Sequence, residues 1–297
     1  MSRPEAAEIA QRYAERAKTA ARMEQAQLDA LADAEAWPQW ASVAARFPQL
    51  SPRNHLLVLA QQPGATLVLP SAGWRDVGRW PKRGSTALRL WESRPIKGDR
   101  GRVTGQTDIL APVFDVTQTD GEPVAMMPTP PPPAPGRAPR GMAAALAGAA
   151  AELGWSVQLR PAPTGAAPEL DDHAHVIVAD PAGDDLAHCT AVLAALTIAA
   201  AAALDSPPGQ RTAVATAAAA VVWATYHLPA PMAVRPCPEW RHAHQTLIAA
   251  VTAATGIAWQ VTDTLAAHAV GTSVAVAGDT MPPPPQPPAL VSLERTA

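Results

Sequence analysis

The chain has 297 residues, a formal net charge of −3, 16% charged and 4% aromatic residues, and two cysteines. This length allows one large domain or two ordinary ones, and 48% hydrophobic residues suffice for packed cores. The sparse, balanced charge excludes an acidic disordered chain and a basic coat protein, and two cysteines exclude a disulfide scaffold and a multi-cysteine zinc module.

Proline-rich segments predict the domain organisation. Seven prolines between Pro128 and Pro139 indicate an extended spacer, because such runs favour the polyproline conformation. We therefore expect an N-terminal domain at 1–124, a linker at 125–140, a second domain at 141–280 and a proline-rich tail at 281–297.

The N-terminal domain is predicted to mix helices with short strands. A polar, alanine-rich helix over 5–31 comes first, and Ser51-Pro52 is typical of a helix start, because serine caps the first turn and proline fits its first position. The expected elements that follow are strands at 66–69, 87–91 and 109–116, a helical turn at 74–80 and a basic loop at 94–105. This pattern predicts a small α+β domain.

Helices dominate the second domain. They are expected at 141–153, 184–203, 209–227, 238–254 and 260–269, with strands at 155–160 and 174–179. The long apolar segment 186–204 is mostly alanine and contains His188 and Cys189, so it indicates a buried helix rather than a membrane span. Residues 1–36 lack an apolar signal segment, and we expect a cytoplasmic protein without membrane contact.

The local charge of the N-terminal domain favours a nucleic-acid partner. Residues 51–107 contain ten basic and three acidic side chains, a net charge of +7, whereas the whole chain is slightly acidic. A local excess of this size attracts phosphate.

The nucleic-acid interpretation assigns contacts to side chains of three kinds. Arginines and lysines would bind phosphates, an asparagine and a glutamine on one helix face would bind bases or phosphates, and a tryptophan would stack on bases. The candidates are Arg53, Asn54, Gln61, Trp74, Arg75, Arg79, Lys82, Arg83, Arg89, Lys97, Arg100 and Arg102. Structural alternatives remain open: a solvated basic surface, tryptophans in the core, and Asn54 as a partner of backbone groups.

Five blocks of sequence carry a family resemblance: Ser51–Leu57, Leu59–Thr66, Trp74–Arg79, Lys82–Gly84 and Val113–Gly121. In this order and spacing, they resemble the N-terminal domain of ArdC-type antirestriction proteins, which occur on plasmids, phages and other mobile elements. The resemblance implies binding of single-stranded DNA without strong sequence preference. It also implies a second, zincin-like metallopeptidase domain with the motif H-E-x-x-H, in which two histidines bind zinc and the glutamate activates water.

The second domain departs from that motif. His188 matches the first zinc ligand, but Cys189 stands in place of the catalytic glutamate and Val192 in place of the second histidine. We therefore expect no catalytic residue, no metal and no cofactor, and a degenerate domain that serves as a scaffold or contacts a protein partner. Two alternatives remain: a zinc peptidase with an unusual site that joins His173 and His175 to His188, and a module that binds only proteins.

Overall fold

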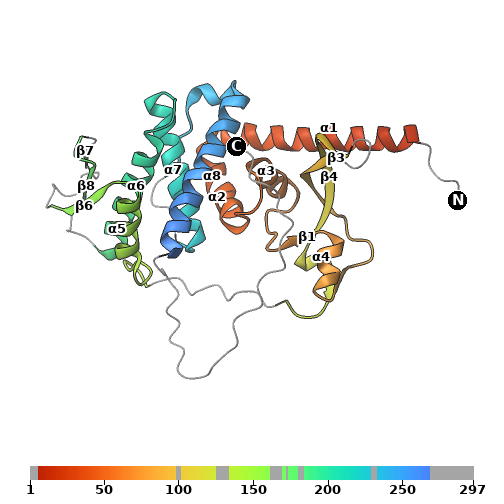
Figure 1. Cartoon of the computed structure of the whole chain (residues 1–297), viewed down its shortest axis with the longest axis horizontal. Coiled ribbons are helices and arrows are strands. Elements are labelled where there is room, and N and C mark those ends of the chain that lie inside the picture. Colours follow the sequence, from red (N-terminus) through yellow and green to blue (C-terminus); the bar gives the residue numbers. More distant parts are fainter. Residues whose placement is uncertain are drawn as a thin grey trace. The chain divides into compact units, whose positions relative to one another are not determined.

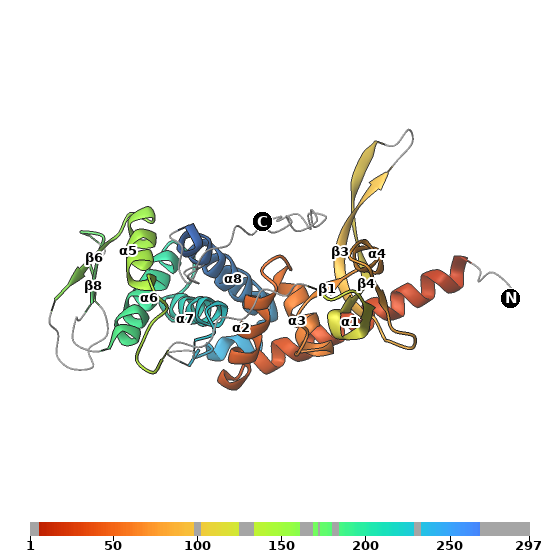
Figure 2. The same ribbon diagram turned by 90° about the horizontal axis from the view of Figure 1, so that it is seen from below.

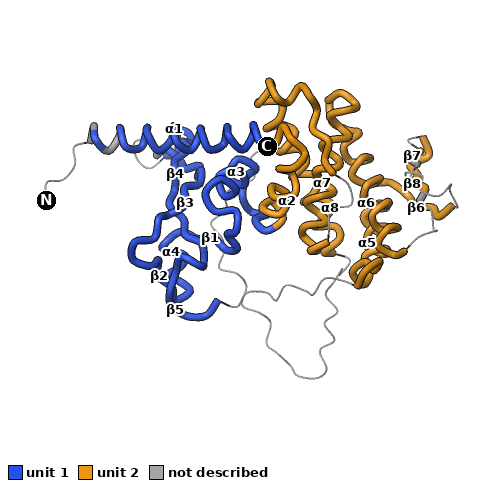
Figure 3. Tube along the Cα trace, turned by 180° about the vertical axis from the view of Figure 1, so that it is seen from behind, with its two compact units in different colours: residues 1–30, 46–127, 285–297 blue, residues 31–45, 128–284 orange. Residues whose placement is uncertain are grey.

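The structure is a computed structural model, and it describes residues 6–97, 102–124, 134–160, 169–171, 173–179, 184–228 and 233–267. The chain divides into two compact units (Figure 3). Of the described residues, unit 1 holds 6–30, 46–97 and 102–124, and unit 2 holds the others. Residues 31–45 thus belong to unit 2, although they precede the proline-rich segment in the sequence. Helices and small, largely antiparallel sheets together confirm the predicted α+β class.

The α-helices of unit 1 are labelled in Figure 1. They are α1 (Ala6–Leu31, whose last residue falls in unit 2), α3 (Pro52–Gln61) and α4 (Ser71–Asp76). The predicted start of α3 is confirmed, because the Ser51 side chain accepts a hydrogen bond from the Asn54 N–H and Pro52 occupies the first turn. Most side chains of α1 are exposed, as its polar composition predicts.

Two small antiparallel sheets complete unit 1. The first has the order β1-β4-β3, formed by β1 (Val68–Leu69), β4 (Val103–Asp115) and β3 (Leu88–Lys97). The second pairs β2 (Arg79–Pro81) with β5 (Thr119–Gly121). The core beside them is built from large apolar side chains, among them Phe47, Leu57, Trp74 and Leu90.

The basic loop expected at 94–105 was a wrong prediction. The register places Arg94 opposite Thr107 and Ile96 opposite Gly105, so most of this segment is strand. The distal part of the β3–β4 hairpin projects from the rest of unit 1 (Figure 2). Pro95 and the glycines near the tip suggested a loop, but the proline imino nitrogen lies on the outer edge of β3, where no ladder hydrogen bond is needed.

Unit 2 is mainly helical. Its longer helices are α2 (Trp37–Arg46, whose last residue falls in unit 1), α5 (Met142–Glu152), α6 (Asp185–Ala201), α7 (Pro208–Thr225) and α8 (His244–Ala267). Short 3-10 helices occur at η1 (Ala34–Ala36) and η4 (Pro238–Arg241). A small sheet has the order β6-β8-β7, in which β6 (Ser156–Leu159) runs parallel and β7 (Glu169–Asp171) antiparallel to β8 (Val176–Ala179).

Alanine fills much of the core of unit 2. Helix α7 packs between α6 and α8, and its buried face includes the run Ala217–Ala220. The two helices expected at 238–254 and 260–269 form the single helix α8 together with η4. Thr255, predicted to lie at the break, is a buried helical residue, and its hydroxyl is satisfied by the Val251 carbonyl at 2.7 Å. Within the described ranges, none of the helices has the length and apolar character needed to cross a membrane.

Candidate nucleic-acid interface

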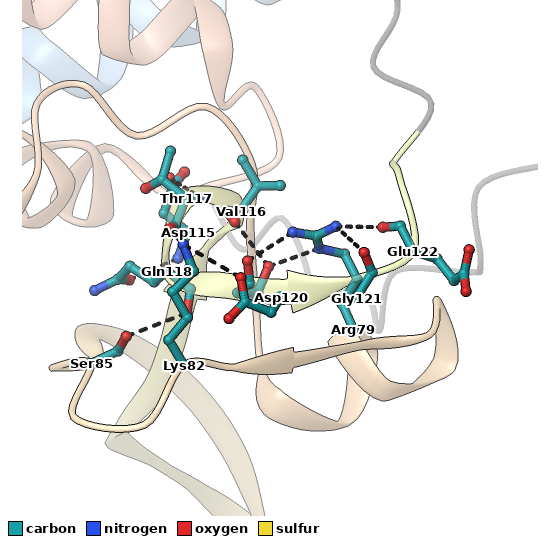
Figure 4. Close-up of polar contacts among 11 residues, drawn as sticks. Arg79, Lys82, Ser85, Asp115, Val116, Thr117, Gln118, Asp120, Gly121 and Glu122 are labelled. Atoms are coloured by element: carbon teal, nitrogen blue, oxygen red, sulfur yellow. Dashed lines mark hydrogen bonds and ion pairs between the residues drawn. The ribbon is translucent and has the colours of Figure 1, made fainter.

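Arg79 ties the two strands of the β2–β5 sheet together (Figure 4). Its guanidinium donates hydrogen bonds to the Thr119 hydroxyl at 2.9 Å and carbonyl at 2.8 Å, and to the carbonyls of Gly121 and Glu122. The same group lies 6.0 Å from the ring centre of Trp74. Arg79 was predicted to bind phosphate; the structure instead gives its donors to backbone carbonyls of the neighbouring strand.

The turn after β4 is held by one buried carboxylate. Asp115 accepts hydrogen bonds from the backbone N–H groups of Thr66 at 2.7 Å, Leu67 at 3.1 Å and Thr117 at 3.0 Å, and from the Thr117 hydroxyl at 2.6 Å. Gln118 completes a capping box by accepting from the Asp115 N–H. Burial alone would raise the pKa of Asp115, but the hydrogen bonds from Thr117, Thr66 and Leu67 lower it below its ordinary value.

Asn54 and Gln61 bind the outer edge of β3. The Asn54 amide accepts from the Trp91 N–H at 2.7 Å and donates to the Trp91 carbonyl at 2.9 Å. Two residues earlier on β3, the backbone of Arg89 forms the same pair of bonds with the Gln61 amide, at 2.8 and 3.0 Å. Their seven-residue spacing on α3 therefore matches two outward-facing positions of a strand. The prediction that they contact DNA is corrected: both amides complete the sheet, and Asn54 is only 2% exposed.

The tryptophans near the basic residues differ in exposure. Trp74, the predicted stacking residue, is fully buried and donates its indole N–H to the Phe114 carbonyl, so that prediction is wrong. Trp91 is half-buried, between the Arg53 guanidinium at 4.9 Å and the Glu24 carboxylate at 3.0 Å. Trp80 on β2 is 56% exposed.

Three of the predicted basic residues keep their side chains free in the part of the chain that the structure describes. Arg75 ends α4, Arg83 follows β2 and Arg102 precedes β4; each is exposed and makes no hydrogen bond or ion pair there. Among the predicted residues, these three are the cations available to a ligand.

The other predicted cations are engaged or only partly available. Arg53 is paired with Glu24, and Lys82 donates to the Thr117 carbonyl at 3.0 Å and lies 3.6 Å from Asp120. Arg89 is half-buried, and burial, followed by the nearby charge of Arg16, lowers its pKa. The Lys97 side chain and Arg100 lie outside the described residues.

Sequence reasoning missed the exposed apolar residues of the hairpin. Ile96 and Val103 are 45% and 57% exposed on the distal part of β3 and β4. Two β-branched residues on either side of the Gly98–Gly101 segment are a hairpin signal. Pro95, just before this stretch, and the basic residues within it obscured that signal.

Comparison with known proteins rests on structure. No protein-family model matches the chain, and no curated protein sequence is similar to it. Two crystal structures of the antirestriction protein ArdC from plasmid R388, one metal-free and one Mn(II)-bound, match 75% of this chain and 92% and 91% of theirs. The TM-scores are 0.53 and 0.51, at 13% and 14% sequence identity. The chain has the ArdC fold. Neither unit alone reaches 75% of the chain, so the match to ArdC draws on both.

Among the described residues of unit 2, no cluster of possible metal ligands is found. No three histidine, cysteine or acidic side chains of the described residues lie close enough to share an ion. His188 on α6 lines an apolar cavity of about 250 Å³ with Leu146, Val157 and Val192, and its Nδ1 atom is buried without a hydrogen-bond partner. Burial, followed by the charge of Asp185, raises the pKa of the Cys189 thiol to about 12, so it stays protonated.

The two histidines predicted as possible partners of His188 are elsewhere engaged or exposed. His175 stacks on the Trp155 ring at 5.0 Å, and both His173 and His175 are exposed. A ligand set of these three histidines is therefore not assembled.

Proposed function

We propose that the protein is an antirestriction-type protein that binds single-stranded DNA through unit 1 and does not hydrolyse peptides. The antirestriction part rests on the fold it has in common with ArdC. The observation that carries the DNA-binding part is the group of exposed, unpaired arginines Arg75, Arg83 and Arg102, all of which belong to unit 1.

Free guanidinium groups are the chemistry that phosphate binding requires. An arginine already bound to a carboxylate gains little from a phosphate, whereas an unpaired one gains a charge-assisted, bidentate contact. The three arginines lie on a helix end, a turn and a hairpin, so they suit an extended backbone rather than one small anion. The exposed ring of Trp80 offers a face for an unpaired base, which a duplex does not present.

Unit 2 would act as a scaffold or contact a protein partner. A peptidase of this type requires a metal that activates water and a general base. His188 is followed by Cys189 instead of a carboxylate, and the thiol stays protonated at neutral pH. Neither His188 nor Cys189 is therefore suited to act as the general base of a peptidase.

Fluorescence anisotropy with labelled oligo(dT) and a labelled duplex, at two or more salt concentrations, tests the DNA-binding part. The triple variant R75E/R83E/R102E is expected to bind the single strand more than about tenfold more weakly. Its salt dependence should fall by about two units of slope, because about 0.7 unit is lost per phosphate contact. The matched control is R140E/R160E/R235E, which reverses three exposed arginines of unit 2 and should bind as the unaltered protein does.

Two results would contradict the DNA-binding part of the proposal. One is the absence of single-strand binding by the unaltered protein at low salt. The other is equal binding by both triple variants. Peptide hydrolysis in the presence of added Zn²⁺ or Mn²⁺, abolished by H188A, would overturn the non-enzymatic part.

A further inference from the structure

The β3–β4 hairpin has a distal arm that extends past the core of unit 1. We define the arm as residues 93–97 and 102–108. Leu88 and Leu90 of β3 are buried, whereas every side chain from Ser93 to Ile96 is exposed. On β4, exposure is similar from Arg102 to Asp108, except for Gly105, and ends at Leu110. Figure 2 shows the arm projecting from unit 1. Both of its faces are therefore open to a ligand.

Ile96 and Val103 are the exposed apolar pair at the distal end of the arm. Ile96 lies opposite Gly105 and Val103 lies opposite Lys97, and the register shifts between these two cross-strand pairs, so one apolar side chain lies on each face of the arm. The Ile96 Cδ1 atom lies 3.7 Å from the position that a Cβ atom on Gly105 would take, so it covers the glycine. A two-stranded ribbon gains little stability in water by itself, and two exposed β-branched residues on it point to a ligand with an apolar surface.

The charge of the arm identifies the kind of ligand. Residues 93–108, which contain the arm, have four basic and two acidic side chains. Arg94 is bound to Glu92, but Arg102 is free within the described residues. A ligand that combines flat apolar faces with regularly spaced negative charges fits such a surface, and a nucleic acid has both.

We infer that the arm is the base-contacting element of unit 1, with Ile96 and Val103 against base faces and Arg102 on the phosphate backbone. This inference rests on the proposed DNA binding and names the residues that contact bases. Bases of a single strand expose their faces, whereas those of a duplex are stacked and paired. The apolar pair thus favours single strands over duplexes.

The double variant I96S/V103S tests the apolar pair without changing charge. We expect it to bind labelled oligo(dT) about fivefold more weakly or worse, to bind duplex DNA unchanged, and to keep the salt slope of the unaltered protein, since no phosphate contact is lost. The variant I96L/V103I should restore binding. The control L159S removes an apolar side chain of unit 2 that is 58% exposed, and it should have no effect.

A shortened hairpin tests the arm as a whole. Replacing residues 95–106 by Asn-Gly leaves Arg94 and Thr107 paired around a two-residue turn, which matches the twist of the strands. The side-chain hydrogen bonds of the removed residues stay inside the arm, between Ser93 and Gln106 and between Ile96 and Thr104, so the core is unaffected. This variant should lose both affinity and salt slope, while its thermal unfolding midpoint changes little.

The outcomes separate the inference from the function on which it rests. Single-strand binding that is equal in the unaltered protein and in both arm variants would overturn the role of the arm and leave the DNA-binding function intact. An equal loss of single-strand and duplex affinity in I96S/V103S would overturn base contact. A failure of the unaltered protein to bind any single strand would overturn both.

Discussion

The two ends of the β3–β4 hairpin use polar side chains in opposite ways. At the base of the hairpin, which we define as Leu88–Glu92 and Ile109–Asp115 with the adjacent helix α3, the side chains of Asp115, Asn54 and Gln61 are bonded to backbone groups. In the arm, Arg102 and the apolar pair are exposed. The difference shows that a polar residue in a recognisable sequence block is a binding candidate only where the fold leaves it unbonded.

The largest effect is expected at Asp115. Asp115→Ala leaves the N–H groups of Thr66, Leu67 and Thr117 without their acceptor, at a cost of about 1–3 kcal/mol for each one that water does not reach. We expect a loss of about 3 kcal/mol or more in the free energy of unfolding, measured by urea denaturation. Asp120→Ala is the control, because the Asp120 side chain is 78% exposed. A similar loss of stability in this variant would contradict the special role of the buried Asp115 carboxylate.

Acid should weaken the base of the hairpin through His55 on α3. Its ring is fully buried, Nε2 donates to the Phe47 carbonyl at 2.9 Å, and burial lowers its pKa from 6.5 to about 4. Because the unfolded chain binds this proton first, stability is full above pH 6.5 and falls as the pH drops towards 4, by about 3 kcal/mol in total.

Urea denaturation at pH 7, 5.5 and 4.5 measures this dependence. His55→Gln removes the titrating group but keeps a donor for the Phe47 carbonyl, so its stability should fall less steeply over the same range. A slope that the substitution leaves unchanged would assign the acid sensitivity to groups other than His55.

Smaller losses are expected at the edge of β3. Asn54→Ala removes two hydrogen bonds at a buried position and should cost about 2 kcal/mol, and Gln61→Ala, at a half-buried position, should cost about 1 kcal/mol. Neither change should alter the affinity of the folded protein for oligo(dT). A selective loss of DNA affinity with unchanged stability would show that both amides contact DNA.

Local signals in the sequence predicted many of the elements. The Ser51-Pro52 start of α3, the alanine-rich helices of unit 2 and the strands near 109–116 and 174–179 follow from caps, periodicity and β-branched residues. The strands β2, β5 and β7 were missed because each has only three residues. The helical turn expected at 74–80 was partly wrong, since α4 ends at Asp76 and β2 begins at Arg79.

The partners of polar side chains were beyond the reach of local reasoning. Asn54 and Trp91 are 37 residues apart, and Arg79 and Thr119 are 40 apart, so their bonds depend on the tertiary fold. The same holds for the tryptophans, since Trp74 and Trp80 are separated by only five residues and yet one is buried and the other exposed. The sequence predicted a basic surface, and the structure was needed to separate its free arginines from its bonded ones.

The amides of Asn54 and Gln61 also block strand pairing between copies of the protein. An unpaired strand edge is a template on which another chain can add a strand and begin to aggregate. Here the outward backbone groups of Arg89 and Trp91 are taken by α3, and Pro95, the outward position after Ser93, has no N–H to offer. The hairpin can therefore be long and exposed without this edge becoming a seed for intermolecular sheet.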